Sequence, residues 1–104
     1  MAISNSLVGA GLETVFSSNG TTALTFMSLC NTSDTATTVS IYIVPSADVP
    51  QPQHLVVTEL LISAKDTFEV YHAAEKIILD NGDKIVIESD QPGAIAAFVS
   101  YTGL

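Results

Sequence analysis

Apolar residues recur at every second position along most of the chain, which is the spacing of a β-strand with one buried face. At residues 39–43, for example, Val39, Ile41 and Ile43 fall on one side. No stretch has a convincing 3.6-residue period, so we expect no helix beyond one turn at 73–76, residues that alternatively open a strand. Eight strands are predicted. They span residues 12–17, 22–31, 39–43, 54–63, 67–71, 76–79, 84–88 and 94–101.

Turn-forming residues separate these runs about every ten residues, a spacing typical of all-β sandwiches. Asn-Gly pairs at 19–20 and 81–82 tolerate positive φ. The sequence Asp-Asn-Gly-Asp at 80–83 is the clearest hairpin signal, and the turn at 31–34 predicts a hairpin between its flanking strands. Three prolines, Pro45, Pro50 and Pro52, predict a loop or crossover, because proline removes ladder donors.

The pattern predicts an all-β fold, an antiparallel β-sandwich of about eight strands with Greek-key or jelly-roll connections. Residues 12–104 form its single domain, and the strand at 54–63, apolar on both faces, is expected to be central and covered. Residues 1–11 carry Ile3, Leu7 and Val8 between small residues. We interpret them as an N-terminal arm, too flexible for a strand and too apolar for a solvated tail, that reaches onto a neighbouring molecule.

Composition and charge restrict the partners of this domain. The 104 residues are 47% hydrophobic and 13% charged, so little charge repulsion opposes association. Three lysines, no arginine and eleven acids give a net charge of −8. This balance argues against binding to nucleic acid and to anionic membranes, both of which require basic side chains. The first six residues have no positive charge and no apolar core, so no signal peptide is expected, and no apolar run is long enough to span a membrane.

Residues that carry catalytic or metal chemistry are few and dispersed. His54 and His72 lie in separate segments without metal-binding spacing. Cys30 is the single cysteine, which excludes an internal disulfide, and its apolar surroundings indicate a small core residue. Asp80 and Asp83 lack the further ligands of an EF-hand and suit a turn. We therefore predict no catalytic, cofactor-binding or metal-binding residues, no cofactor, and a protein that is not an enzyme.

Four segments carry a resemblance to a known group of proteins. They are Leu-Thr-Phe-Met-Ser-Leu-Cys-Asn-Thr at 24–32, the stretch 31–45 ending in Val-Pro, Ile-Ile-Leu-Asp-Asn-Gly-Asp-Lys-Ile at 77–85, and 94–103 with Val-Ser-Tyr near its end. Together they resemble small virion structural proteins of tailed bacteriophages, notably phages of cyanobacteria. The resemblance covers nearly the whole chain and implies a complete gene product. It brings no catalytic residues, since the shared positions are turn and core residues.

The resemblance implies a β-sandwich on the particle that cements the capsid lattice or forms part of the tail or baseplate. We expect a structural subunit, with capsid decoration favoured, that contacts other virion proteins and copies of itself and is made in the host cytoplasm before it joins the virion. One alternative is a module that binds host-surface glycans, although Tyr42, Tyr71 and Tyr101 are scattered and tryptophan is absent. The other, a cupin-like enzyme, lacks clustered histidines.

Overall fold

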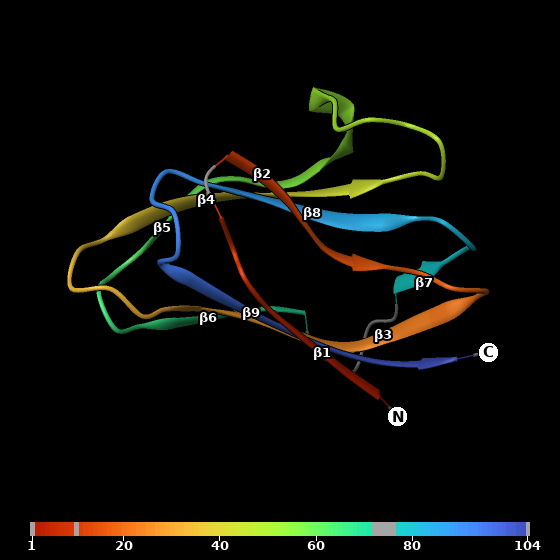
Figure 1. Ribbon diagram of the computed structural model, residues 1–104, viewed down its shortest axis with the longest axis horizontal. Helices are drawn as coiled ribbons and strands as arrows, with labels where there is room; N and C mark the ends of the chain where they lie inside the picture. The colour runs from red at the N-terminus through yellow and green to blue at the C-terminus, as the bar shows by residue number, and fades with distance from the viewer. Residues whose placement is uncertain (1, 10, 72–76, 104) are drawn as a thin grey trace.

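The computed structural model describes residues 2–9, 11–71 and 77–103, which form nine strands and one 3₁₀ turn (Figure 1). The elements are β1 (Ala2–Leu7), β2 (Gly11–Ser17), β3 (Thr22–Asn31), β4 (Thr37–Val44), η1 (Pro52–His54), β5 (Leu55–Ile62), β6 (Thr67–Tyr71), β7 (Ile77–Leu79), β8 (Lys84–Ser89) and β9 (Ile95–Gly103). Two predicted strands, 22–31 and 67–71, have the observed bounds, and the other six agree within two residues. The predicted helical turn at 73–76 lies outside the described residues.

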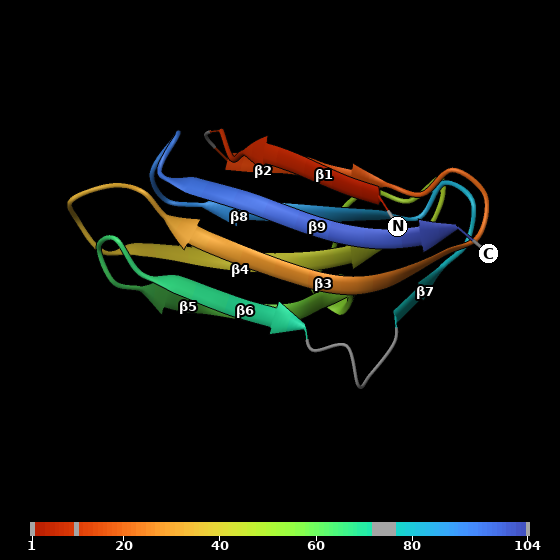
Figure 2. The same cartoon turned by 90° about the horizontal axis from the view of Figure 1, so that it is seen from below.

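The strands form two antiparallel sheets that face each other. Sheet A has the order β1-β9-β3-β6, with β7 paired to the start of β3, and sheet B has the order β2-β8-β4-β5. Figure 1 shows the two layers from the side, and Figure 2 shows the outer face of sheet A in front. The predicted all-β antiparallel sandwich is confirmed.

The pairing is nested along the chain. β1 pairs with β9, β2 with β8, β3 with both β7 and β6, and β4 with β5. One long antiparallel hairpin, rolled around a core so that its arms alternate between two sheets, has this arrangement. The strand order is therefore that of a jelly roll, one of the two connection schemes expected.

Two predicted hairpins are wrong. The turn at 31–34 joins β3 of sheet A to β4 of sheet B, and the turn at 80–83 joins β7 of sheet A to β8 of sheet B. The turn chemistry itself is present, since Gly20 and Gly82 have φ of 77° and 88°. These turns lie at the ends of the sandwich, where the rolled chain passes from one sheet to the other. A turn residue reverses the chain direction, but burial of apolar faces selects the strand that each strand pairs with.

The expectation of a flexible arm is also wrong for the part of 1–11 that the structure describes. β1 pairs with β9 over six residue pairs, from Ala2 with Tyr101 to Leu7 with Ala96. Val8, which follows, is fully buried, and its backbone bonds to Ile95 and Gly93 at 2.8 Å each. The segment has a period of two, and β9 needs a partner on its open side. The pairing of β1 with β9 uses this period and supplies β9 with a neighbour, without a second molecule.

A third correction concerns β5, which lies at the edge of sheet B and not in a covered position. Val56 and Leu61 are exposed there. Apolar residues on both faces suited a central strand, but β5 is the second arm of the innermost hairpin and has only β4 beside it. The proline-rich segment is the loop of this hairpin, as the prediction of a loop allowed.

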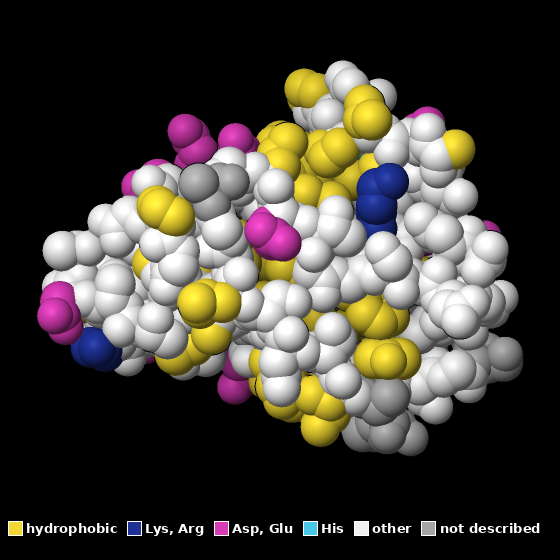
Figure 3. All heavy atoms as spheres, in the orientation of Figure 1, with side chains coloured by type: hydrophobic (Ala, Val, Ile, Leu, Met, Phe, Trp, Pro, Cys, Tyr) yellow, Lys and Arg dark blue, Asp and Glu magenta, His cyan; other side chains and the backbone are white. Residues whose placement is uncertain are grey.

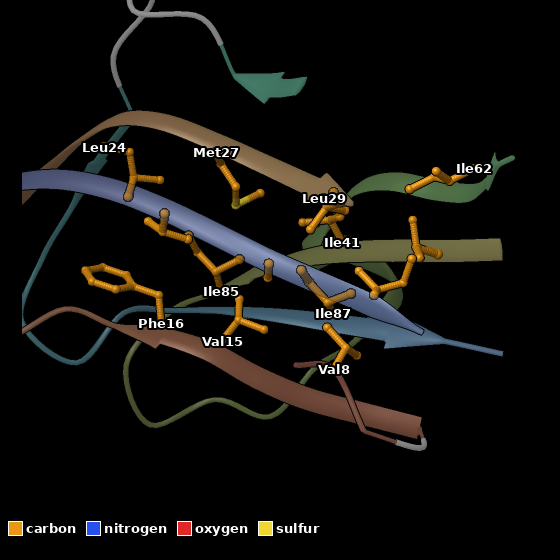
Figure 4. Packing of buried hydrophobic residues seen from close by; sticks show 14 of the residues in the cluster. Val8, Val15, Phe16, Leu24, Met27, Leu29, Ile41, Ile62, Ile85 and Ile87 are labelled. Atoms are coloured by element: carbon orange, nitrogen blue, oxygen red, sulfur yellow. The ribbon is translucent and has the colours of Figure 1, made fainter. Parts of the chain in front are cut away.

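The core lies between the sheets and is filled from both (Figure 4). Leu29 and Ile95 of sheet A and Ile41, Ile85 and Ile87 of sheet B are all 0% exposed. A bulge in β2 between Thr14 and Phe16 turns two successive residues inward, and the Phe16 ring packs on Tyr101 of sheet A, with 4.7 Å between ring centroids. These contacts make the two sheets one domain.

Asn31 is a fully buried polar residue at the end of β3, where the chain leaves sheet A. Its Nδ2 donates to the backbone oxygens of Thr35 (2.8 Å) and of Ile62 in sheet B (2.9 Å). Its Oδ1 accepts from the backbone N–H (3.0 Å) and hydroxyl (2.7 Å) of Ser33. All four hydrogen-bonding positions are used, so burial of this amide is compensated and it joins the two sheets.

Candidate interaction surface

The residues considered for metal or catalytic chemistry do not come together. Within the described ranges, no group of three or more His, Cys, Asp and Glu side chains is placed to hold a metal ion. His54 closes the η1 turn, where its Nδ1 accepts from the backbone N–H of Gln51 at 3.1 Å and its Nε2 lies 3.6 Å from Asp48. His72 lies outside the described residues.

Two side chains of the acidic turn at 80–83 accept hydrogen bonds from backbone N–H groups. Asp83 accepts from the backbone N–H groups of Ser46 and Asp80, both at 2.9 Å. Asn81 accepts from the backbone N–H of Gly20 at 2.8 Å. These bonds tie three loops together at one end of the sandwich, which agrees with a turn role for both aspartates.

Cys30 does not lie in the core. It is half-buried on the outer face of sheet A, while its neighbours Leu29 and Asn31 point inward. The apolar residues around Cys30 in the sequence suggested burial, but strict alternation in β3 puts it on the opposite side from Leu29. The tyrosines are dispersed as well, since Tyr42 lies on sheet B and Tyr101 packs between the sheets.

The outer face of sheet A is free of charged side chains over three adjacent strands. β1, β9 and β3 together contain no Asp, Glu, Lys or Arg. On β1, Ile3 and Leu7 point outward and are 59% and 60% exposed, while Ser4 and Ser6 point toward the other sheet. Such an orientation leaves apolar surface in water unless another molecule covers it.

Residues of this face align in rows across the strands. The first row is Leu7–Ala96–Cys30, the second is Asn5–Phe98–Ser28, and the third is Ile3–Ser100–Phe26. Phe26 and Phe98 are in edge contact with ring centroids 6.1 Å apart. An open groove of about 390 Å³ lies over the first two rows, and it is lined mainly by apolar atoms. We call this three-row surface the sheet A face.

The floor of the groove is Ala96, because its methyl group is much smaller than the side chains beside it. Leu7 on β1 and Cys30 on β3 are its partners in register, and Phe98 follows two residues along β9 on the same side. A small residue between larger ones makes a hollow, and the adjacent phenylalanine makes a projection. The sheet A face is therefore not flat.

The outer face of sheet B differs. A hollow of about 290 Å³ there is lined by Thr38, Ser40 and Ser89 and by three carboxylates, Glu59, Glu88 and Asp90. Its exposed apolar residues, Leu12, Val56 and Leu61, lie on the edge strands β2 and β5. The polar residues Thr38 and Ser40 of β4 and Glu88 of β8 lie between these two strands.

Tyr42 belongs to this acidic side. Its hydroxyl donates to Glu88 Oε1 at 3.2 Å. Desolvation raises the pKa of Tyr42 above its usual value, and the negative charge of Glu88 and the hydrogen bond to it raise the pKa further.

Figure 3 shows the side of the sandwich that β1 and β2 share. Hydrophobic side chains gather in its lower part over β1 and also beneath the loop between β4 and β5, and several acidic side chains gather at its upper left. The absence of charge from β1, β3 and β9 was visible in the sequence. That these three strands are neighbours follows only from their pairing.

Comparisons with known proteins add no relative: no protein-family model, no curated protein and no solved structure matches the chain. Among the described residues, no helix is long and apolar enough to cross a membrane. Fold and surface thus define a jelly-roll β-sandwich with one acidic outer face and one outer face that carries no charge on three adjacent strands.

Proposed function

We propose that this chain is a non-enzymatic structural subunit of a phage particle. Decoration of the capsid lattice is the favoured role, and a place in the tail or baseplate is the alternative. The short motifs described above support the phage origin. The jelly roll is also an architecture of viral capsid domains, although lectins and cupins share it, so fold analogy supports the proposal without carrying it.

The observation that carries the proposal is the sheet A face. An uncharged surface with exposed Ile3 and Leu7 and two outward phenylalanines is suited to lasting contact with another protein. A protein that diffuses alone gains nothing from it. A subunit that is always packed against neighbours keeps this surface out of water.

The direct test is to purify tailed-phage particles from the host that carries this gene, analyse their proteins by mass spectrometry, and label intact particles with an antibody raised against the chain. Label on the head indicates decoration, and label at the tail indicates the alternative. Antibody absorbed beforehand with purified chain is the control. If the chain is expressed during infection but absent from the particles, the proposal is wrong.

A glycan-binding role has one observation in its favour. Tyr42 stands half-exposed beside the polar hollow of sheet B, and a sugar could use its ring and the nearby carboxylates. A glycan array probed with the wild type and with Tyr42→Ala tests this role. Binding that Tyr42→Ala abolishes would support a receptor-binding subunit in place of decoration.

A further inference from the structure

We propose that a second copy of this chain docks on the sheet A face, and that the Phe98 ring of each copy fills the hollow over Ala96 of the other. The inference does not depend on the phage assignment, because it follows from the shape, size and charge of one surface.

Charge decides in favour of a second copy. The chain has a net charge of −8, so most ways of bringing two copies together place carboxylates near carboxylates. The outer face of sheet B does so with Glu59, Glu88 and Asp90. The three strands of the sheet A face carry no acid, and Glu69 on the adjacent β6 lies at its margin. Two copies can meet here without close repulsion, and a basic partner would find few groups to pair with.

The area is that of a small interface. With about 4.8 Å between strands and a rise of about 3.4 Å per residue, the 6, 9 and 10 residues of β1, β9 and β3 cover roughly 400 Å² of flat sheet. Side-chain relief increases the accessible area beyond this value. A standard protein interface buries about 800 Å² on each partner, and weak interfaces bury less than about 600 Å². The sheet A face therefore has the size of a weak interface, which agrees with association at tens of micromolar.

The shape is self-complementary. Phe98 and Ala96 lie two residues apart on one strand and on one side, so the projection and the hollow are adjacent. A two-fold axis that runs across β9 at Ala97, between the facing sheets, places residue 98 of one copy over residue 96 of the other, and the reverse. The same rotation sets Leu7 opposite Asn5 and Cys30 opposite Ser28. An interface of this kind closes after two copies, because both use the same surface.

Two leucines of nearly equal exposure provide a matched test. Leu7 lies on the sheet A face and is 60% exposed, while Leu61 lies on sheet B and is 64% exposed. Light scattering and sedimentation equilibrium of the wild type at tens of micromolar should give a dimer of twice 10.9 kDa. We expect Leu7→Glu to weaken the dimer at least tenfold and Leu61→Glu to leave it unchanged, with circular dichroism confirming that both fold.

A strictly monomeric wild type would overturn the proposal, and so would equal weakening by the two substitutions. If the monomer instead bound phage particles and Leu7→Glu abolished that binding, the sheet A face would belong to another virion protein. That result would also overturn the second-copy assignment while leaving the proposed function intact.

The two-fold geometry has its own test. Phe98→Ala removes the projection and Ala96→Phe fills the hollow, so each substitution alone should weaken the dimer. The double variant Ala96→Phe/Phe98→Ala exchanges projection and hollow, and under the two-fold axis they face each other again. We expect it to dimerise at least tenfold more tightly than either single variant. A double variant no tighter than the singles would exclude this packing.

Discussion

The two sheets are alike on their inner faces and different on their outer faces. Leu29 and Ile95 face Ile41, Ile85 and Ile87 across one core, and every one of these residues is fully buried. Outside, sheet A shows uncharged rows with two phenylalanines, whereas sheet B shows a polar hollow with three carboxylates. The inner faces therefore account for the fold, and the difference between the outer faces bears on what the protein contacts.

The largest effect should come from truncating the shared core once from each sheet. We expect Leu29→Ala in sheet A and Ile87→Ala in sheet B each to lower the free energy of unfolding by about 2–5 kcal/mol, because both remove fully buried side chains from one packed cluster. Urea unfolding measures both. A large loss from one sheet combined with almost none from the other would show that the sheets do not share a single core.

Asn31 tests the connection between the sheets. Asn31→Ala removes two donors from the backbone oxygens of Thr35 and Ile62 and an acceptor from Ser33, and it leaves those groups short of partners. We expect a loss of about 2–4 kcal/mol. Thr38→Ala in β4, whose side chain is half-buried, is a control expected to stay within about 0.5 kcal/mol. An Asn31→Ala protein as stable as the control would show that these bonds contribute little.

Gly82 tests the corner at which the chain passes from sheet A to sheet B. Its φ is 88°, and an added Cβ would lie 2.5 Å from Ser46 Oγ. Gly82→Val should cost about 1–3 kcal/mol through strain alone, with the collision adding to it. Gly20→Val is the matched control, because φ is 77° there but the space is open. Thermal unfolding should rank Gly82→Val as the less stable of the two, and the opposite ranking would contradict the described corner.

The smallest effect concerns the acidic face. Glu88→Gln should lower the pKa of Tyr42 without restoring its usual value, because desolvation is the main cause of the elevation. Since the folded state holds this proton more tightly, stability should fall as pH rises above about 10, the value for tyrosine in an unfolded chain. Absorbance titration of tyrosinate, with Tyr42→Phe as the reference, measures the shift. A pKa unaffected by Glu88→Gln would leave desolvation as the sole cause.

Much of the secondary structure was predictable. Alternation of apolar residues located eight strands within two residues of their observed bounds, because the side-chain period of a strand is local. Positive φ at Gly20 and Gly82 was predictable from Asn-Gly for the same reason.

The pairing of those strands depended on the tertiary structure. Asn81 and Gly82 signalled a hairpin, yet β7 and β8 lie in different sheets because the rolled chain buries both apolar faces in one core. β1 was missed as a strand since Ile3 and Leu7 point outward whereas Ser4 and Ser6 point inward, the reverse of the usual order. Only long-range pairing with β9 makes that segment part of the sandwich.

The sheet A face also depends on the pairing of distant strands. The sequence by itself determined that β1, β3 and β9 contain no charge. It also determined that Ala96 and Phe98 share one side of β9 and that Phe26 lies on the same side of β3 as Cys30. Only the tertiary structure decided that these strands are neighbours and that the sides coincide. Alternation assigns a residue to one face of its own strand, whereas a surface made of three strands depends on contacts between residues distant along the chain.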